Sequence, residues 1–397
     1  MLTVGALVSS VGANEFSDVM SNGTFKGQIK VDSYTKSTGT LDQTSLLMMA
    51  LRLNYVTDNF YGFSAGASSQ TATAPGSNSS ESLAMFKGNV VGIGQYSEGT
   101  VLSESYLKYK FNKTSVKAGR QYLYMPLIQH AISRIVKQSF SGVTAMDKSL
   151  PDTTIRGAYI NMVQSCATSD GDIADFEPLD DDNNKAYAIS ALNKSVKGLS
   201  LTGAFGEYQN NYSIFQGEAD YKIELGALKY NVALKHAQTT NDDSDRGNPY
   251  FTTAKIGAAM KGFGGYLAYS NVSTEEATTA QQMGQYQARH GVAGAATKLS
   301  GLYTNTYINA SDFYDSKQKG IGLYYKRPGV VVQLRYTDVD ITYDDISGDY
   351  SDYNTKMFRG VYKFTKDLIG ICIYERSDKK DSDDSKEELR LRLVYNF

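Results

Sequence analysis

The chain has 397 residues and a formal net charge of −2, so no overall positive field favours nucleic acid as a partner. No apolar run reaches the roughly 18 residues that a membrane-spanning helix requires, which excludes a helical membrane protein. The 36 glycines, 6 prolines and 30 tyrosines are typical of strands and tight turns, although the lack of tryptophan is unusual for a membrane barrel.

The N-terminal residues look like the apolar part of a secretory signal. Residues 2–13 are small or apolar and end on Ala13, after which cleavage would occur, but no Lys or Arg precedes them. We therefore expect residues 1–13 to be a truncated signal peptide. The alternative is a small apolar N-terminal strand.

Short windows in which apolar residues alternate with polar ones recur from residue 25 onward. In the second window the apolar set is Leu47, Met49, Leu51 and Leu53. This period of two predicts strands with one apolar and one polar face. We find eighteen segments, most near the ~10 residues that cross a bilayer at a tilt: 25–31, 47–55, 60–69, 101–111, 115–121, 139–149, 152–163, 185–194, 198–208, 213–224, 226–238, 249–260, 263–273, 315–326, 329–341, 353–364, 367–376 and 386–397.

The connections between these segments alternate in length. Short links, such as 57–59 and 112–114, follow even-numbered segments, whereas long polar links, such as 70–100 and 274–314, follow odd-numbered ones. Short turns at one end and long loops at the other are typical of outer-membrane barrels, whose turns are periplasmic and whose loops are extracellular. An even number of strands also brings both chain ends to the periplasmic side.

The final segment, 388–397, alternates strictly and ends on Phe397. Outer-membrane barrels close with such a strand, and its last aromatic residue lies at the membrane interface. We expect Phe397 to be recognised by the barrel assembly machinery. The sequence thus predicts an all-β protein: one transmembrane antiparallel β-barrel of about 18 strands over residues 20–397, surrounded by outer-membrane lipid.

If the apolar residues of each strand face lipid, the alternate residues face the lumen. By this rule the inward arginines are Arg52, Arg156, Arg335, Arg359, Arg376, Arg390 and Arg392. The simplest explanation is that charged side chains must face water, and the lumen is the only side of the barrel wall that contains water. A guanidinium, however, keeps its charge and binds a carboxylate through two hydrogen bonds, so a column of arginines favours a path for anions.

The link 122–138 is too apolar for a loop in water. We expect it to fold inward and narrow the channel, which would bring Arg134 and Lys137 to the constriction.

The residues around this link resemble a known family. Gly119-Arg120-Gln121, Pro126, and Arg134 followed by Gln138-Ser139-Phe140-Ser141-Gly142 are similar to the third-loop region of the OprD-type porins, with its glycine, its proline and its Arg-x-x-x-Gln-x-Phe-x-Gly pattern. The layout of residues 20–397, with Asn309–Tyr314 and Phe397, is also similar. The resemblance implies a barrel of about 18 strands that admits small solutes, commonly carboxylates, past a column of arginines. The chain departs from the family in lacking tryptophan and in several short loops, and its arginines are not matched one by one to that column.

Motifs for catalysis are weak. Gly62-Phe63-Ser64-Ala65-Gly66 fits Gly-x-Ser-x-Gly, but no helical pattern follows it, as a nucleophile elbow requires. The chain has 3 histidines, and His236 is the best-placed base for a barrel hydrolase. No zinc spacing, phosphate loop or dinucleotide fingerprint is present. We expect no enzyme, no cofactor and no metal site.

Two further features have simple explanations. The acidic stretches at 170–182 and 378–384 are expected to be solvated loops; the alternative is a divalent cation that bridges surface loops. Cys166 and Cys372 are expected to be unpaired thiols.

Three functions remain open from the sequence. The first is a passive porin for small anionic or carboxylate-bearing solutes. The second is a general porin in which the arginines set only a weak anion preference. The third is a surface adhesin with a plugged lumen. Association into homo-oligomers is also left open.

Overall fold

The computed structural model describes residues 13–39, 41–77, 96–130, 134–168, 170–243, 247–273, 291–292, 301–306, 315–341 and 352–397. All of the predicted signal segment except Ala13 lies outside these residues. The acidic segments at 170–182 and 378–384 are both described.

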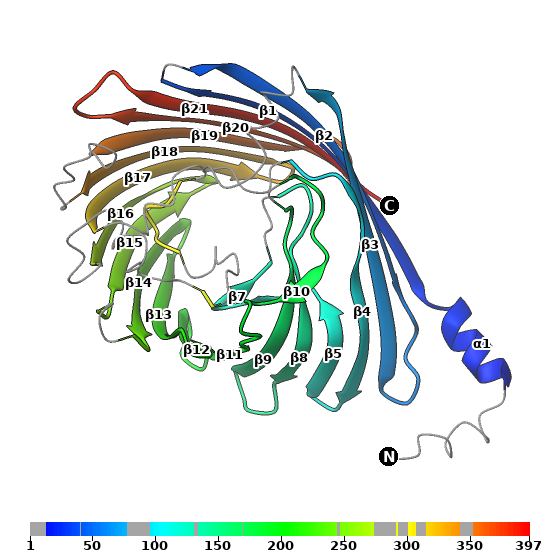
Figure 1. The fold of residues 1–397 in the computed structure, drawn as a ribbon. Coiled ribbons are helices and arrows are strands. Elements are labelled where there is room, and N and C mark those ends of the chain that lie inside the picture. The colour runs from blue at the N-terminus through cyan, green and yellow to red at the C-terminus, as the bar shows by residue number, and fades with distance from the viewer. Residues whose placement is uncertain are drawn as a thin grey trace.

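Within the described residues, eighteen long strands form one closed antiparallel sheet, as predicted (Figure 1). They are β1 (Thr24–Thr38), β2 (Leu41–Val56), β3 (Phe63–Ser77), β4 (Gly99–Phe111), β5 (Thr114–Gln121), β8 (Ser139–Asp147), β9 (Thr153–Gln164), β11 (Ala186–Asn193), β12 (Leu199–Tyr208), β13 (Tyr212–Leu225), β14 (Leu228–Asn241), β15 (Tyr250–Met260), β16 (Phe263–Ser273), β17 (Ser316–Arg327), β18 (Val330–Ile341), β19 (Tyr353–Lys363), β20 (Leu368–Lys379) and β21 (Ser385–Asn396). A short strand, β10 (Phe176–Pro178), extends the sheet beside the loop end of β9.

Several strands are longer at their loop ends than the sequence pattern predicted. β1 runs to Thr38 rather than residue 31, and β3 runs to Ser77 rather than residue 69. The outward residues in these extensions include Ser33, Thr35 and Thr73. Polar residues on both faces hide the period-two signal, because a strand that projects beyond the hydrocarbon no longer needs an apolar outer face.

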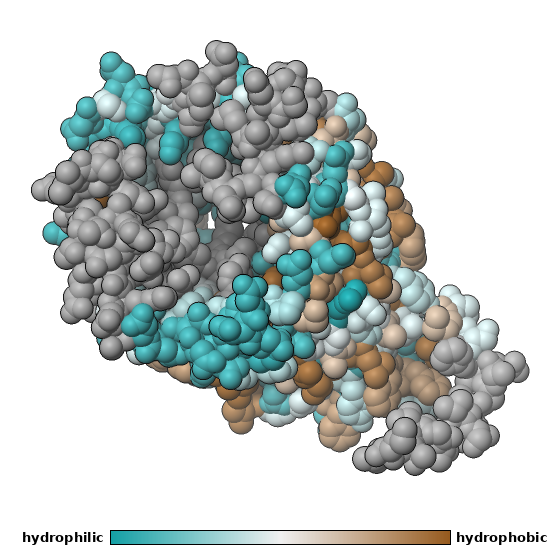
Figure 2. All heavy atoms as spheres, viewed as in Figure 1, coloured by the Kyte–Doolittle hydropathy of each residue, from teal (hydrophilic) through white to brown (hydrophobic). Residues whose placement is uncertain are grey.

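The outer wall is apolar and is bordered by aromatic residues near the turns. Figure 2 shows hydrophobic residues on the outer wall and hydrophilic residues around the rim of the opening. Ring pairs on the outer face near the turns include Phe63 with Tyr109, at 4.5 Å between centroids, and Phe263 with Tyr325, at 4.4 Å. Amphipathic and aromatic rings at this position mark the level of the lipid head groups.

The tight turns depend on residues that tolerate positive φ. In the turn between β15 and β16, Lys261 and Gly262 have φ values of 51° and 89°. Two consecutive residues with positive φ form the turn whose twist matches that of the flanking strands. A Cβ on Gly262 would lie 2.4 Å from the carbonyl oxygen of Lys326 at the end of β17. The close approach of the neighbouring β17–β18 turn is therefore a second reason for a glycine at position 262.

A short helix, α1 (Ala13–Ser21), precedes the barrel and was not predicted. It lies outside the barrel wall, beyond the turn end of β1 (Figure 1). The backbone amide of Asp58 donates to the carbonyl oxygen of Val19 at 3.1 Å, which connects the helix to the turn between β2 and β3. Among the described residues, no helix is long and apolar enough to cross a membrane.

The seam between β1 and β21 closes the barrel along its full length, from Thr38 opposite Lys386 to Gln28 opposite Asn396. Gly27 and Phe397 then exchange two backbone hydrogen bonds of 2.7 and 3.0 Å, so pairing continues to the last residue. Closure leaves no sheet edge with unpaired backbone groups in the hydrocarbon.

A buried charged cluster lies across this seam on the lumen side. Asp32 of β1 accepts hydrogen bonds from Arg390, at 2.6 Å, and from Arg392. The side chain of Asp32 is fully buried, and those of the two arginines are 1% and 7% exposed. The ring of Tyr34 lies 4.5 Å from the Arg390 guanidinium carbon. One carboxylate therefore joins the first and last strands through two guanidinium groups.

Replacing Asp32 by Asn is expected to destabilise the barrel. Two buried guanidinium groups would lose their shared carboxylate, and breaking a buried ion pair costs about 3–5 kcal/mol. The folded band on unboiled gels should disappear at a clearly lower temperature than in the wild type. Asp58→Asn, which removes a carboxylate from a turn, is the control. Equal melting of the two variants would contradict a stabilising role for the seam cluster.

The two faces of β18 provide a second prediction. Leu334 is 51% exposed on the outer face, whereas its neighbour Gln333 faces the lumen and accepts a hydrogen bond from Arg359. Leu334→Arg should impair assembly, because a charge facing the hydrocarbon costs up to about 2–4 kcal/mol. Gln333→Arg should assemble like the wild type. Comparing the folded fractions of both variants in phospholipid vesicles tests the assignment, and equal folding would contradict it.

Candidate channel and its constriction

The link 122–138 folds into the lumen, as predicted. Its first half forms a small hairpin of β6 (Tyr124–Met125) and β7 (Ile128–Gln129). The apolar side chains of this hairpin pack against the inner wall of β8 to β13. The cluster consists of Leu123, Met125, Leu127, Ile128, Phe140, Ala158, Ile160, Ala186, Ala188, Ala204, Tyr212, Ile214 and Val292. An apolar patch inside a wet barrel thus holds the first half of the loop.

Close packing of this hairpin requires a small residue on the wall. A Cβ on Gly206 of β12 would lie 3.1 Å from Leu127 Cδ1 and 2.9 Å from Val292 Cγ1. The backbone of Leu127 also accepts a hydrogen bond of 3.0 Å from the amide of Val292. Residues 291–292 belong to the long link between β16 and β17, so two loops meet at this point in the lumen.

The second half of the link 122–138, called here the constriction loop, is attached to the wall formed by β1 to β3. Ile135 and Val136 pack with Tyr34, Leu46 and Met48 in a second buried cluster. Polar contacts add to this packing. The Lys30 ammonium lies 3.3 Å from the carbonyl oxygen of Arg134 and 3.4 Å from that of Ile135.

Gln70 forms a matched pair of hydrogen bonds with the backbone of Lys137. Its amide nitrogen donates to the Lys137 carbonyl oxygen at 3.0 Å, and its amide oxygen accepts from the Lys137 amide at 2.9 Å. Both atoms of the wall side chain are therefore used to position one loop residue. The described parts of both loop halves are thus fixed to the barrel, on different walls.

The Lys137 side chain lies in a polar cavity of about 300 Å³ beside the loop. Arg52 of β2 lines the same cavity, and the ring centre of Tyr122 lies 5.9 Å from the Arg52 guanidinium carbon and 5.1 Å from the Lys137 ammonium. Glu104 lines it as well and forms an ion pair of 3.2 Å with Lys117. Arg52 and Lys137, called here the constriction pair, give this side of the passage a positive potential.

The position of Lys137 changes its acidity. Burial, and then the positive charge of Arg52, lower the pKa of Lys137 to about 8. The nearby imidazole of His130 is affected more strongly: burial, and then Lys137, lower its pKa to about 4. At neutral pH Lys137 is therefore mostly charged beside Arg52, and His130 is neutral.

Three further predicted arginines face the lumen from other walls. Arg156 donates to the Tyr124 carbonyl oxygen at 3.3 Å, Arg335 to the Asn305 carbonyl oxygen at 3.1 Å, and Arg359 to Gln333 at 3.3 Å. Arg156 and Arg335 thus contact inward-folded loops, whereas Arg359 stays on the barrel wall. Arg134 is half-buried at the end of the constriction loop.

The prediction of the column is wrong in two respects. Arg376 lies on the outer face: it is 45% exposed and forms ion pairs with Asp378 and Glu387, at 2.6 and 2.8 Å. Its neighbour Glu375 is fully buried on the lumen side. Arg376 shares the phase of the outward Tyr374, so strict alternation places it outside. Arg390 and Arg392 do face inward, but they are buried against Asp32 rather than open to solutes.

The sequence also missed a second inward segment, residues 301–306. Tyr303 donates to Glu218 at 2.7 Å, and the ammonium of Lys235 lies 3.4 Å from Glu218 and 3.2 Å from the Gly301 carbonyl oxygen. The Lys255 ammonium lies 4.6 Å from the centre of the Tyr303 ring. This mixed cluster on β13 to β15 faces the lumen. Its only signal in the sequence was the phase of Glu218, Lys235 and Lys255 in their strands.

The features that could suggest other chemistry do not form sites. Ser64 lies within β3, not in a strand-to-helix turn, and His236 faces outward on β14, where it contacts Thr252. Cys166 and Cys372 are free thiols, as predicted. In the described part of the chain, no three His, Cys, Asp or Glu side chains are grouped to hold a metal ion.

Comparison with known proteins supports the architecture. No protein-family model and no curated protein matches the sequence. Among solved structures, Pseudomonas aeruginosa OpdO matches with a TM-score of 0.76 and 12% identity, covering 96% of this chain and 99% of that one. Acinetobacter baumannii OccAB4 matches with a TM-score of 0.75 and 13% identity, covering 94% and 98%.

A third match is to Pseudomonas aeruginosa OpdK solved with vanillate, with a TM-score of 0.71, 15% identity and coverage of 94% and 98%. Identity this low demonstrates a common fold and nothing finer. The fold implied by the third-loop resemblance is therefore confirmed: this chain has the architecture of the OprD/Occ outer-membrane channels over nearly its whole length.

Proposed function

We propose that this protein is an outer-membrane channel through which small anionic solutes, above all carboxylates, diffuse past the constriction pair. The observation that carries this proposal is the placement of Arg52 and Lys137 around Tyr122, in a polar cavity beside the inward-folded loop. Both loop halves are fixed to the wall, so the charges have defined positions rather than sweeping through water.

The chemistry of the pair suits a carboxylate. A guanidinium binds a carboxylate through two parallel hydrogen bonds, and an ammonium adds a compact positive charge. The ring of Tyr122 offers an apolar surface beside them for the organic part of the solute. OpdK, which shares the fold, was solved with vanillate, an aromatic carboxylate. Each interaction is weak enough in a wet lumen for the solute to leave again.

Current recordings of the purified protein in planar bilayers test the proposal. In a salt gradient, the reversal potential should show that anions are more permeant than cations, and a small aromatic carboxylate should reduce the chloride current. A large current without charge preference would instead indicate a general porin. Absence of any current from folded protein would indicate a plugged barrel and contradict a channel function.

Arg52→Gln and Lys137→Gln should each reduce anion selectivity. A unit charge contributes about 1 kcal/mol at 4 Å in water, so removing one should change the ratio of anion to cation permeability roughly fivefold. The effect should shrink in high salt, where exposed charges are screened. Lys194→Gln, in the turn between β11 and β12, is the control and should leave the ratio unchanged. Unchanged selectivity in both constriction variants would contradict the assignment of the pair.

The lowered pKa of Lys137 predicts a pH dependence. A lysine with a pKa of about 8 is mostly protonated at pH 7 and mostly neutral at pH 9. Anion selectivity should therefore fall as the pH rises through this range. Lys137→Arg should remove the effect, because a guanidinium keeps its charge at both pH values. The measurement is the reversal potential of each variant at pH 7 and pH 9. A fall of equal size in both would show that another group titrates.

A further inference from the structure

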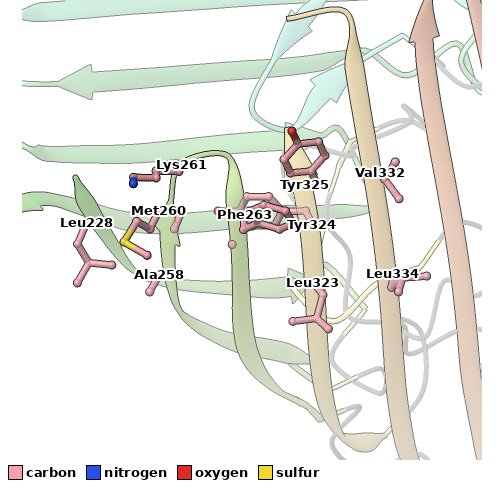
Figure 3. Close-up of a pocket in the computed structure, with 12 residues that line it drawn as sticks. Leu228, Ala258, Met260, Lys261, Phe263, Leu323, Tyr324, Tyr325, Val332 and Leu334 are labelled. Atoms are coloured by element: carbon pink, nitrogen blue, oxygen red, sulfur yellow. The ribbon is translucent and has the colours of Figure 1, made fainter. Parts of the chain in front are cut away.

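The outer wall is hollowed near the turns between β14 and β18. This hollow has a volume of about 670 Å³ and is lined almost wholly by apolar side chains (Figure 3). Small residues produce it. Ala258 of β15 lines it on the outer face, and the larger Leu323 and Leu334 follow in the same row of outward positions. The wall is therefore thinner at Ala258 than at the two leucines.

A second hollow, of about 570 Å³, lies beside the first on the same wall, and Val332 lines both. Its floor is formed by Gly360, Gly370 and Cys372, which are also small residues on the outer face of neighbouring strands. Two adjacent apolar hollows that share one side chain offer room for two neighbouring hydrocarbon chains. Both hollows open towards the lipid, since their lining residues are outward-facing.

Exposed cations lie at the turn end of the first hollow. Lys261 lies in the β15–β16 turn and forms part of the lining (Figure 3). Arg327 is exposed at the end of β17, and the two turns are adjacent because the Lys326 amide donates to the Gly262 carbonyl oxygen at 2.8 Å. Among the described residues, neither Lys261 nor Arg327 has a carboxylate partner within salt-bridge distance. Both are therefore available to an external anion.

Neighbouring aromatic rings set the depth of these cations in the membrane. Phe263 and Tyr325 form a ring pair directly beside Lys261, and Tyr362 and Phe364 form another at the second hollow, with centroids 4.9 Å apart. Aromatic rings at barrel ends lie at the level of the lipid head groups. Lys261 and Arg327 lie at the turn side of the first pair, where a lipid phosphate would be.

At the loop end of the same wall, charges of both signs pair with one another, as Lys319 and Asp340 do at 3.6 Å. There Lys380 is surrounded by Asp338, Asp340 and Asp352, with nitrogen-to-oxygen distances of 3.1, 2.5 and 3.7 Å. An anionic head group is therefore favoured at the turn end of this wall by Lys261 and Arg327.

We propose that this wall binds one anionic phospholipid of the leaflet that faces the turns. The phosphate contacts Lys261 and Arg327, one acyl chain fills the hollow at Ala258, and the other crosses Val332 into the second hollow. The combination of adjacent cations, ring pairs and two connected hollows gives the site its shape. The site is outside the lumen and goes beyond the proposed channel function.

A second copy of the chain suits this wall less well. A contact related by a two-fold axis would place the same patch of both copies together. It would bring Lys261 and Arg327 of one barrel towards their equivalents in the other, where like charges repel. A lipid phosphate neutralises the same cations.

Native mass spectrometry of the purified barrel tests the proposal. The protein is transferred to micelles that contain equal amounts of phosphatidylglycerol and phosphatidylethanolamine, and the lipid retained after detergent removal is counted. The wild type should keep one phosphatidylglycerol in preference to phosphatidylethanolamine. The double variant K261Q/R327Q should lose this retention roughly tenfold or more, since each basic residue near an anionic surface contributes about a factor of five.

Two more variants separate charge from shape. Ala258→Phe fills the first hollow without changing charge and should also reduce retention. K194Q/K197Q removes two exposed lysines from the β11–β12 turn, away from the hollows, and should retain the lipid like the wild type. Folding of each variant is checked by heat-modifiable migration, and single-channel current should be unchanged in all of them because none of the substitutions lies in the lumen.

The proposal is overturned if phosphatidylethanolamine is retained as well as phosphatidylglycerol. It is also overturned if K194Q/K197Q lowers retention as much as K261Q/R327Q, which would indicate a diffuse attraction to the whole rim. Retention unchanged by both K261Q/R327Q and Ala258→Phe would exclude this wall. A dimer without lipid that dissociates in either of these two variants would assign the wall to a second copy.

Discussion

Closure of the sheet by the pairing of β1 with β21 is the constraint on which the rest of the structure depends. In hydrocarbon every backbone amide and carbonyl must find its partner within the protein, so a barrel with an open edge would be unstable. Pairing over the whole seam, down to the bonds between Gly27 and Phe397, meets this requirement. Closure then divides the side chains into an outer set that meets lipid and an inner set that meets water.

The inner set is not uniform, and this is what makes a defined passage. Apolar residues on the walls at β1–β3 and β8–β13 form patches onto which the constriction loop folds. Lys30 and Gln70 supply the polar contacts that the loop backbone needs once it leaves water. A loop attached at both ends holds Lys137 at a fixed distance from Arg52. The electrostatics of the lumen therefore follow from packing, because a mobile lysine would not have its pKa lowered by burial.

The outer set of side chains is not uniform either. The wall that bears the hollows has small residues on several adjacent strands, exposed cations at its turns and paired charges of both signs at its loops. A lipid-facing surface needs only to be apolar, so this distribution of charge and shape points to a specific neighbour. The channel uses the inner face of the barrel and the lipid site its outer face, so the two can be tested separately.

Much of the fold could be predicted from the sequence, because strand faces and turn lengths are local properties. The period of two located eighteen strands, and the alternation of short and long links gave the two ends of the barrel. The inward folding of 122–138 followed from its apolar composition. Strand ends were less accurate, since β1 and β3 continue with polar residues on both faces. Arg376 was assigned to the wrong face, although it lies two residues after the outward Tyr374 and strict alternation therefore places it outward as well.

What the sequence by itself determined is therefore the alternation that makes a barrel and the identity of the residues on its inner face. Only the tertiary structure decided which of those residues are open to the lumen. Arg390 and Arg392 are identical to Arg52 as side chains, but Asp32, 358 and 360 positions away in the chain, lies beside them once the seam closes. Arg52 instead faces a polar cavity with Lys137. Charge pairing across a closed sheet depends on contacts between residues distant in sequence, and no local sequence pattern predicts such contacts.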